Sequence, residues 1–185
     1  LLVILATTIH TSGFLIAFIY PVYHIRIKKS WLIAIIPMLA LIFAFNEPIF
    51  KFLAVFIENY TAYDLSIYRT GAYAMLILFA LLVVFSFIIP DEAKLDKETV
   101  GLRNLLLLSL AIQMFVPLHN LAMRMNYYFI IFIPLLIPRI IELSREKYRQ
   151  VAIAARHVMV VFFLAYFFYN AYTRTGNLHV FPYHF

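Results

Sequence analysis

The 185-residue chain contains no cysteine, only four glycines, and few charged residues, which make up 13% of the sequence. The absence of cysteine excludes disulfides, thiolate metal sites and cysteine nucleophiles. The four scattered glycines form no glycine-rich loop that could hold a phosphate, and no H-E-x-x-H pattern occurs. ATP hydrolysis and zinc proteolysis are therefore not supported.

Apolar residues dominate what is present, at 65% of the sequence. A mean hydropathy of +0.92 is too high for a soluble domain. The apolar residues form blocks of about 15 to 23 residues, the length that a helix needs to cross about 30 Å of hydrocarbon. The sequence therefore predicts an all-α fold, a polytopic transmembrane helix bundle of about six spanning helices. The expected spans are 1–23, 31–45, 72–89, 102–121, 122–138 and 151–169.

We expect residues 1–185 to form a single transmembrane domain. The chain opens inside an apolar block, without an initiator Met or a signal-peptide pattern, which indicates the C-terminal part of a longer polytopic protein. Between the second and third spans, Asn46 and Pro48 favour a helix start, and Glu47, Lys51 and Glu58 share one stripe. This pattern predicts an amphipathic helix lying in the membrane interface.

Basic residues gather at alternate ends of the apolar blocks, and this pattern predicts the topology. Eleven of the fifteen Lys and Arg residues lie in or beside the linkers after the first, third and fifth spans. Because Lys and Arg are retained on the cytoplasmic side, residues 139–150 are expected to form a cytoplasmic loop and 46–71 an extracytoplasmic segment. Both ends of the chain are then expected to be extracytoplasmic.

The turn at 119–128 carries ionisable side chains toward the outer membrane surface. Only 37 residues run from Leu102 to Pro138, and two helices of about 18 residues each would use all of them. We therefore expect Arg124 and His119 to lie near or below the outer headgroups, where a cation needs a partner or a wet cavity. A lipid-linked pyrophosphate is one such partner for a guanidinium. The alternative is that Arg124 is an ordinary interfacial anchor.

His10 interrupts the first apolar block about halfway across the membrane, roughly 15 Å from the first residue. Thr7 and Thr11 share its helix face, so the three side chains are candidates to line a polar cavity. An ionisable group at this depth is usually functional. The alternative is structural, because Thr often returns its hydrogen bond to its own helix and a single buried His can be a packing residue.

The second half of the expected outer segment, 60–70, mixes tyrosines with one acid and one base. Tyr63 offers a flat ring to sugar C–H groups, while Asp64 and Arg69 can hydrogen-bond hydroxyls, so the segment is a candidate glycan site. Tyrosines also collect at membrane interfaces as anchors, and the two charged residues can be a plain surface ion pair. His179 and His184 lack an acidic partner and are weak metal candidates, so no metal site is expected.

With these residues in view, the chain resembles the C-terminal half of the EpsG family, Wzy-like membrane proteins of bacterial exopolysaccharide synthesis. The resemblance rests on His10-Thr11-Ser12 followed by an apolar run into Pro21-Val22-Tyr23. It rests also on Arg124 followed by Tyr127-Tyr128-Phe129 and a proline-rich span that ends at Pro138.

The resemblance implies an enzyme of the bacterial cytoplasmic membrane. The implied activity is an inverting, metal-independent glycosyltransferase, without a cofactor, that polymerises undecaprenyl-pyrophosphate-linked oligosaccharide repeat units. Exopolysaccharide, capsule and O-antigen are the possible products. The implied partners are the lipid-linked glycan, membrane lipids and other polysaccharide synthesis and export proteins, with no nucleic acid. The candidate bases are His10, His119 and Asp64. The candidate substrate-binding residues are Arg124, Arg69, Tyr63, Tyr127 and Tyr128.

Two other functions fit many of the same features: a polysaccharide or lipid-linked oligosaccharide transporter (flippase), and a noncatalytic membrane partner of a synthesis complex. A transporter needs polar residues along both halves of its path. The inner halves of the expected spans 31–45, 72–89 and 122–138 are almost wholly apolar. This distribution favours an outward-facing site and hence the polymerase.

Overall fold

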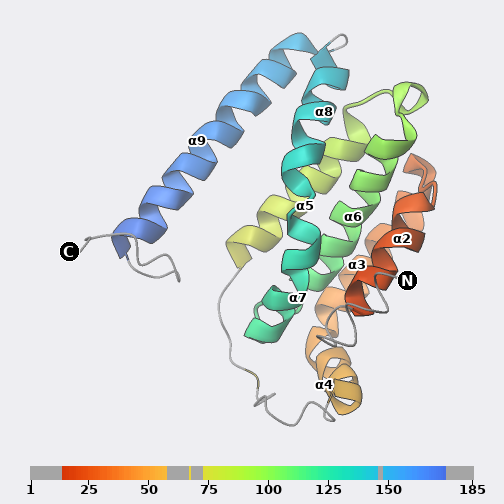
Figure 1. The fold of residues 1–185 in the computed structure, drawn as a ribbon, viewed down its shortest axis with the longest axis vertical. Coiled ribbons are helices and arrows are strands. Elements are labelled where there is room, and N and C mark those ends of the chain that lie inside the picture. The colour runs from red at the N-terminus through yellow and green to blue at the C-terminus, as the bar shows by residue number, and fades with distance from the viewer. Residues whose placement is uncertain (1–13, 58–66, 68–72, 146–147, 174–185) are drawn as a thin grey trace. The chain divides into compact units, whose positions relative to one another are not determined.

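The computed structural model describes residues 14–57, 67, 73–145 and 148–173, and the regular elements in these ranges are all helical (Figure 1). An all-α fold is therefore confirmed for this part of the chain. The chain divides into two compact units, Leu1–Ile140 and Ile141–Phe185. The helices are α2 (Phe14–His24), α3 (Leu32–Ala44), α4 (Asn46–Ile57), α5 (Tyr73–Ile88), α6 (Lys97–Gln113), α7 (Asn120–Ile130), α8 (Ile133–Arg145) and α9 (Arg149–Thr173), with 3-10 turns η2 (Lys29–Trp31) and η3 (Glu92–Lys94).

The number of spanning helices differs from the expectation. Of the described helices, α9 is the one long and apolar enough to cross a membrane by itself, over Arg149–Tyr169. Two bent pairs, α3 with α4 and α7 with α8, bring the number to three if each pair is one span. The six expected spans are not confirmed, and a single domain over the whole chain stays a prediction.

Three of the eight prolines coincide with the ends of helices. Each lies four residues after the last residue of a helix: Pro48 after Ala44, Pro117 after Gln113 and Pro134 after Ile130. A proline cannot donate a hydrogen bond to the carbonyl four residues earlier, and its ring collides with that carbonyl. The chain therefore bends by 78° between α3 and α4 and by 51° between α7 and α8.

The helices observed at 97–113, 120–130 and 133–145 differ from the expected boundaries at 102–121 and 122–138. α6 begins at Lys97, inside the expected charged linker, because the Asp96 side chain caps it by accepting from the Thr99 N–H at 2.8 Å. It ends at Gln113, four residues before Pro117. A turn over 114–119 therefore separates α6 from α7, where we expected almost no loop. The expected span 122–138 is two helices, α7 and α8.

α6 is the central helix of the first unit and packs against α2, α5 and α7 (Figure 1). Twelve of its seventeen residues are buried, as expected for a helix that is apolar on most sides. At Gly101 an added Cβ would lie 2.6 Å from the Tyr23 ring. The missing side chain thus lets α2 approach α6 closely, as small residues do in membrane helix pairs.

Large apolar side chains cover the outer faces of several helices. On α5 the residues Ile77, Leu81, Val84 and Ile88 are each at least half exposed, while the opposite face is buried. Only 6% of the apolar stretch of α9 is buried by the rest of the protein. Apolar faces of this extent suit contact with lipid better than contact with water.

The linkers after α2 and α5, both expected on the cytoplasmic side, meet at one end of the first unit, which we call the basic end. The backbone N–H of Lys29 donates to Glu92 at 2.8 Å and joins the linker after α2 to the linker after α5. Arg139, the first residue of the third basic linker, lies 2.8 Å from Glu98 at the start of α6. The position of these residues at the basic end agrees with the alternating topology. Which side of the membrane the basic end faces stays a prediction.

Arg103 holds the basic end together from inside. Its side chain is 1% exposed, and its Nη2 donates to the Ile27 carbonyl at 2.7 Å. Its guanidinium lies 3.9 Å from the centre of the Phe87 ring and 3.7 Å from Glu92. The neighbouring Asn104 donates to two carbonyls of the segment that leads into the same linker. A buried cation needs such partners, and Arg103 is therefore a structural clamp between α6 and the linker after α2.

Replacing Asp96 tests the start of α6. Asp96→Ala should lower the free energy of unfolding by about 1 kcal/mol, because the α6 N-terminus loses its cap. Hydrogen bonds from Thr99 hold the pKa of Asp96 below its usual value. The charged form is thus favoured in the folded state, so this contribution is present above about pH 4 and is lost as the pH falls through the lowered pKa.

The measurement is reversible unfolding in mixed detergent micelles between pH 3 and 7. This interval contains the usual pKa of an aspartate, about 3.9. Asp96→Asn is the matched control, because asparagine also caps helices but does not titrate. It should keep most of the stability and lose the acid dependence. An Asp96→Ala variant as stable as the wild type would contradict this assignment of the cap.

Candidate functional site

α7 carries four of the candidate residues, and the structure positions them from its first residue onward. His119 is its N-cap residue, and Arg124, Tyr127 and Tyr128 lie along the helix. The other candidates, His10, Tyr63, Asp64 and Arg69, lie outside the described residues.

His119 is buried, with 6% of its surface exposed, and stacks on Phe50 of α4 at 5.6 Å between ring centres. Its Nδ1 accepts the backbone N–H of Leu121 at 2.9 Å, which satisfies one of the free donors at the start of α7. Because Nδ1 is the acceptor, the neutral ring carries its proton on Nε2. In this geometry His119 is a hydrogen-bond donor, and it can act as a base only if the capping bond breaks.

α4 packs against the turn between α6 and α7, at the end of the first unit opposite the basic end. Besides the stacking of Phe50 on His119, the Asn46 side chain donates to the Met114 carbonyl at 3.0 Å. The polar N-terminus of α4 and the N-terminus of α7 thus lie together. The two segments that the sequence assigns to the extracytoplasmic side meet here, as the alternating topology requires.

A buried polar network fixes α7 against α6. Ser109 Oγ donates to Asn126 Oδ1 at 2.7 Å, and Asn126 Nδ2 donates to Gln113 Oε1 at 2.7 Å. All three side chains are at most 3% exposed. Ser109 and Gln113 are four residues apart and therefore share one face of α6. This network was not predicted from the sequence. The signal was present, because Ser109, Gln113 and Asn126 are polar residues within apolar blocks, where such side chains often bond between helices.

The network sets which side chains α7 presents outward. Arg124 lies about 160° around the helix from Asn126, on the exposed face. Tyr127 and Tyr128 follow it by three and four residues, so they are its neighbours on that face, with Tyr127 48% exposed and Tyr128 half-buried. The structure therefore brings Arg124, Tyr127 and Tyr128 together and separates them from buried His119.

The exposed face of α7 combines two chemical properties. The guanidinium of Arg124 presents a planar set of donors that matches phosphate oxygens. The tyrosine rings offer flat apolar faces and hydroxyls that suit a sugar. Within the described ranges no three His, Asp or Glu side chains gather closely enough to hold a metal ion. The expectation of a metal-independent site stays a prediction.

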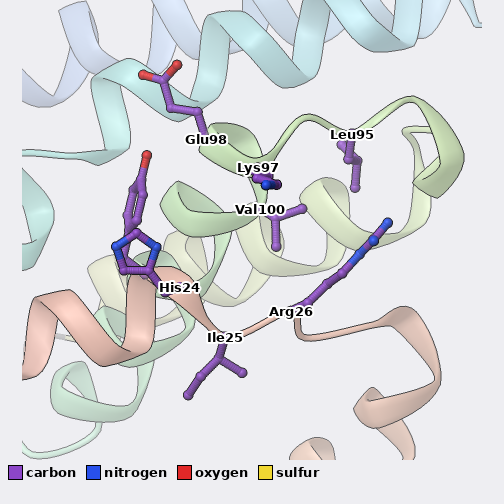
Figure 2. Close-up of a pocket in the computed structure, with 8 residues that line it drawn as sticks. His24, Ile25, Arg26, Leu95, Lys97, Glu98 and Val100 are labelled. Atoms are coloured by element: carbon purple, nitrogen blue, oxygen red, sulfur yellow. The ribbon is translucent and has the colours of Figure 1, made fainter.

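A cavity of about 400 Å³ lies away from α7, at the basic end. Figure 2 shows that its walls come from the end of α2 with the linker after it, and from the start of α6 with the residues before it. No sequence pattern predicted this cavity, because the cavity depends on how closely α2 and α6 approach one another.

Replacing Asn126 tests the network. Asn126→Ala should lower the free energy of unfolding by about 1 to 2 kcal/mol, because Ser109 and Gln113 lose their partner in an apolar surrounding. Asn120→Ala, an exposed asparagine in the same helix, should change it by less than about 0.5 kcal/mol. Unfolding in mixed detergent micelles gives both values. Equal effects of the two substitutions would show that the network does not hold α7.

Comparison with known proteins gives one result. The model of the EpsG family matches residues 1–185, the whole chain. No curated protein and no solved structure matches the chain. The family match confirms the resemblance drawn from the motifs around His10 and Arg124, and the exposed apolar helix faces agree with a protein that lies in the membrane. The chain belongs to the EpsG family of Wzy-like polysaccharide polymerases and is an integral membrane protein of exopolysaccharide biosynthesis.

Proposed function

We propose that the chain is a membrane glycosyltransferase that polymerises repeat units carried on undecaprenyl pyrophosphate. The exposed face of α7 then binds the lipid-linked glycan at the outer side of the bacterial cytoplasmic membrane. The observation that carries this proposal is the exposure of Arg124 beside Tyr127 and Tyr128 on a helix whose other face is fixed by buried hydrogen bonds.

The reaction needs positive charge where the pyrophosphate leaves. The oxygen of a sugar hydroxyl attacks the anomeric carbon of the growing glycan, the bond from that carbon to the pyrophosphate oxygen breaks, and the lipid pyrophosphate leaves with the electron pair. Attack from the face opposite the leaving group inverts the anomeric centre. The guanidinium of Arg124 stabilises the charge that develops on the pyrophosphate. Arg69 is the second candidate for this role.

A base must take the proton of the attacking hydroxyl. The buried position of His119 and its capping bond make it the weakest of the three candidates in this conformation. We therefore place His10 and Asp64 ahead of it. His119 then acts as a positioning residue that sets the start of α7 and with it the place of Arg124.

The tyrosines supply binding rather than chemistry in this proposal. Tyr127 and Tyr128 contact the sugar rings next to the pyrophosphate, and Tyr63 is a further candidate for a sugar contact. Aromatic rings at such a site hold a glycan by stacking on its C–H faces, while their hydroxyls bond to sugar oxygens. Different repeat units can then be accepted without a change in the residues that hold the pyrophosphate.

Arg124→Ala should lower polymerisation at least about tenfold, because the leaving pyrophosphate loses a charged, two-donor partner. Arg124→Lys should restore part of the activity, since lysine keeps the charge but not the paired geometry. The measurement is the length and yield of polymer in cells that lack the native gene, together with the amount of variant protein in the membrane.

Arg149→Ala is the matched control, because it removes an exposed arginine at the start of α9 and should leave the polymer unchanged. Cells without activity should accumulate single repeat units on the outer leaflet. Accumulation on the inner leaflet would indicate a flippase instead. Polymer of normal length and yield from the Arg124→Ala variant would remove Arg124 from the mechanism.

A further inference from the structure

The cavity at the basic end is a candidate binding site that the polymerase reaction does not use. Its cationic side chains come from two segments, with Arg26 on the linker after α2 and Lys97 at the start of α6 (Figure 2). The cavity thus forms only where the packing of α2 on α6 brings these segments together.

The charge around the cavity is positive. Arg26 and Lys97 are both exposed, and neither forms an ion pair with a carboxylate of the described residues. Glu98 also lines the cavity, and Arg139 lies 2.8 Å from Glu98 and 3.5 Å from Asp96, so one cation is shared between two carboxylates. With Arg26, Lys97 and Arg139 set against Asp96 and Glu98, one positive charge is left over, and an anionic ligand is the natural partner.

The walls of the cavity combine polar and apolar groups. Leu95 and Val100 are buried and form an apolar wall, while Tyr23 and His24 also line the cavity and add polar groups. A phosphate bound by arginine and lysine beside an apolar wall is the pattern of a lipid headgroup site between membrane helices.

The residues around the cavity are of types that collect at a membrane interface. The only tryptophan of the chain, Trp31, lies at the end of η2 at the same end of the first unit and is 51% exposed. Ile25, which lines the cavity, is 44% exposed. Tryptophan and exposed apolar residues beside lysines are typical of the headgroup level.

We propose that this cavity binds the phosphate of an anionic membrane lipid from the leaflet at the basic end. Arg26 and Lys97 hold the phosphate, and the wall formed by Leu95 and Val100 contacts the glycerol and the first methylenes of the lipid. The proposal rests on the chain being a membrane protein and not on its polymerase activity. A bound lipid would join α2 to α6 at the end where Arg103 already clamps the linker.

The test measures the binding of phosphatidylglycerol, with phosphatidylcholine as the uncharged comparison, by native mass spectrometry of the full chain at physiological salt. The double variant Arg26→Gln with Lys97→Gln should bind phosphatidylglycerol about tenfold or more weakly, because each cation near the surface contributes appreciably to the attraction. Arg26→Lys with Lys97→Arg should retain binding. Both positions are exposed, so the variants are expected to fold.

The double variant Lys28→Gln with Lys29→Gln is the matched control. It removes the same charge from the same end, but neither residue lines the cavity. It should weaken binding by less than about threefold, through the loss of diffuse attraction alone. Equal losses in the two double variants would overturn the proposal, because they would show diffuse attraction without a site.

Two further results would also overturn it. Equal binding of phosphatidylcholine would show that the phosphate charge is not recognised, and displacement of the lipid by millimolar inorganic phosphate would show a site for a soluble anion. Binding is measured without polymerisation, so a negative result here leaves the proposed function of α7 intact. A loss of polymer in Arg124 variants would, in turn, leave this site untouched.

Discussion

The hydrogen bonds that Asn126 accepts from Ser109 and donates to Gln113 are the interaction on which the rest of the first unit depends. They lie in an apolar surrounding, where an unpaired amide is costly. Rotation of α7 about its axis would break these bonds, so the orientation of α7 against α6 is fixed. This fixed rotation exposes Arg124 on the opposite face. The function proposed for Arg124 is therefore a consequence of residues that make no contact with the substrate.

Prolines explain which parts of the fold could be predicted from the sequence. Apolar blocks predicted helices near α3, α5 and α9, because block length and hydropathy suffice for that inference. They did not predict the break between α7 and α8, although Pro134 lies four residues after Ile130 and prevents the helix from continuing. The start of α6 was missed because Asp96 caps it inside a charged segment that looked like a linker.

The candidate site could be predicted only in part, because residue type indicates chemistry but not which face of a helix a side chain occupies. Arg124, Tyr127 and Tyr128 were expected at a turn between two spans, and the structure places them along one helix, α7. His119 was expected beside them, yet its ring caps α7 and stacks on Phe50, a residue far away in the sequence. The role of Arg103 as a clamp also depends on contacts with distant segments, which no local pattern reveals.

The central claim is that the exposed face of α7 meets the lipid-linked glycan outside the cytoplasm. Because these 185 residues contain no cysteine, an Asn120→Cys substitution on that face adds a single label site to them. A membrane-impermeant maleimide should label it from outside intact spheroplasts, and added lipid-linked repeat units should slow the labelling, whereas Lys28→Cys at the basic end should label only after the membrane is opened. Labelling of Asn120→Cys only from the inside, or at a rate that the lipid-linked substrate does not change, would contradict the account.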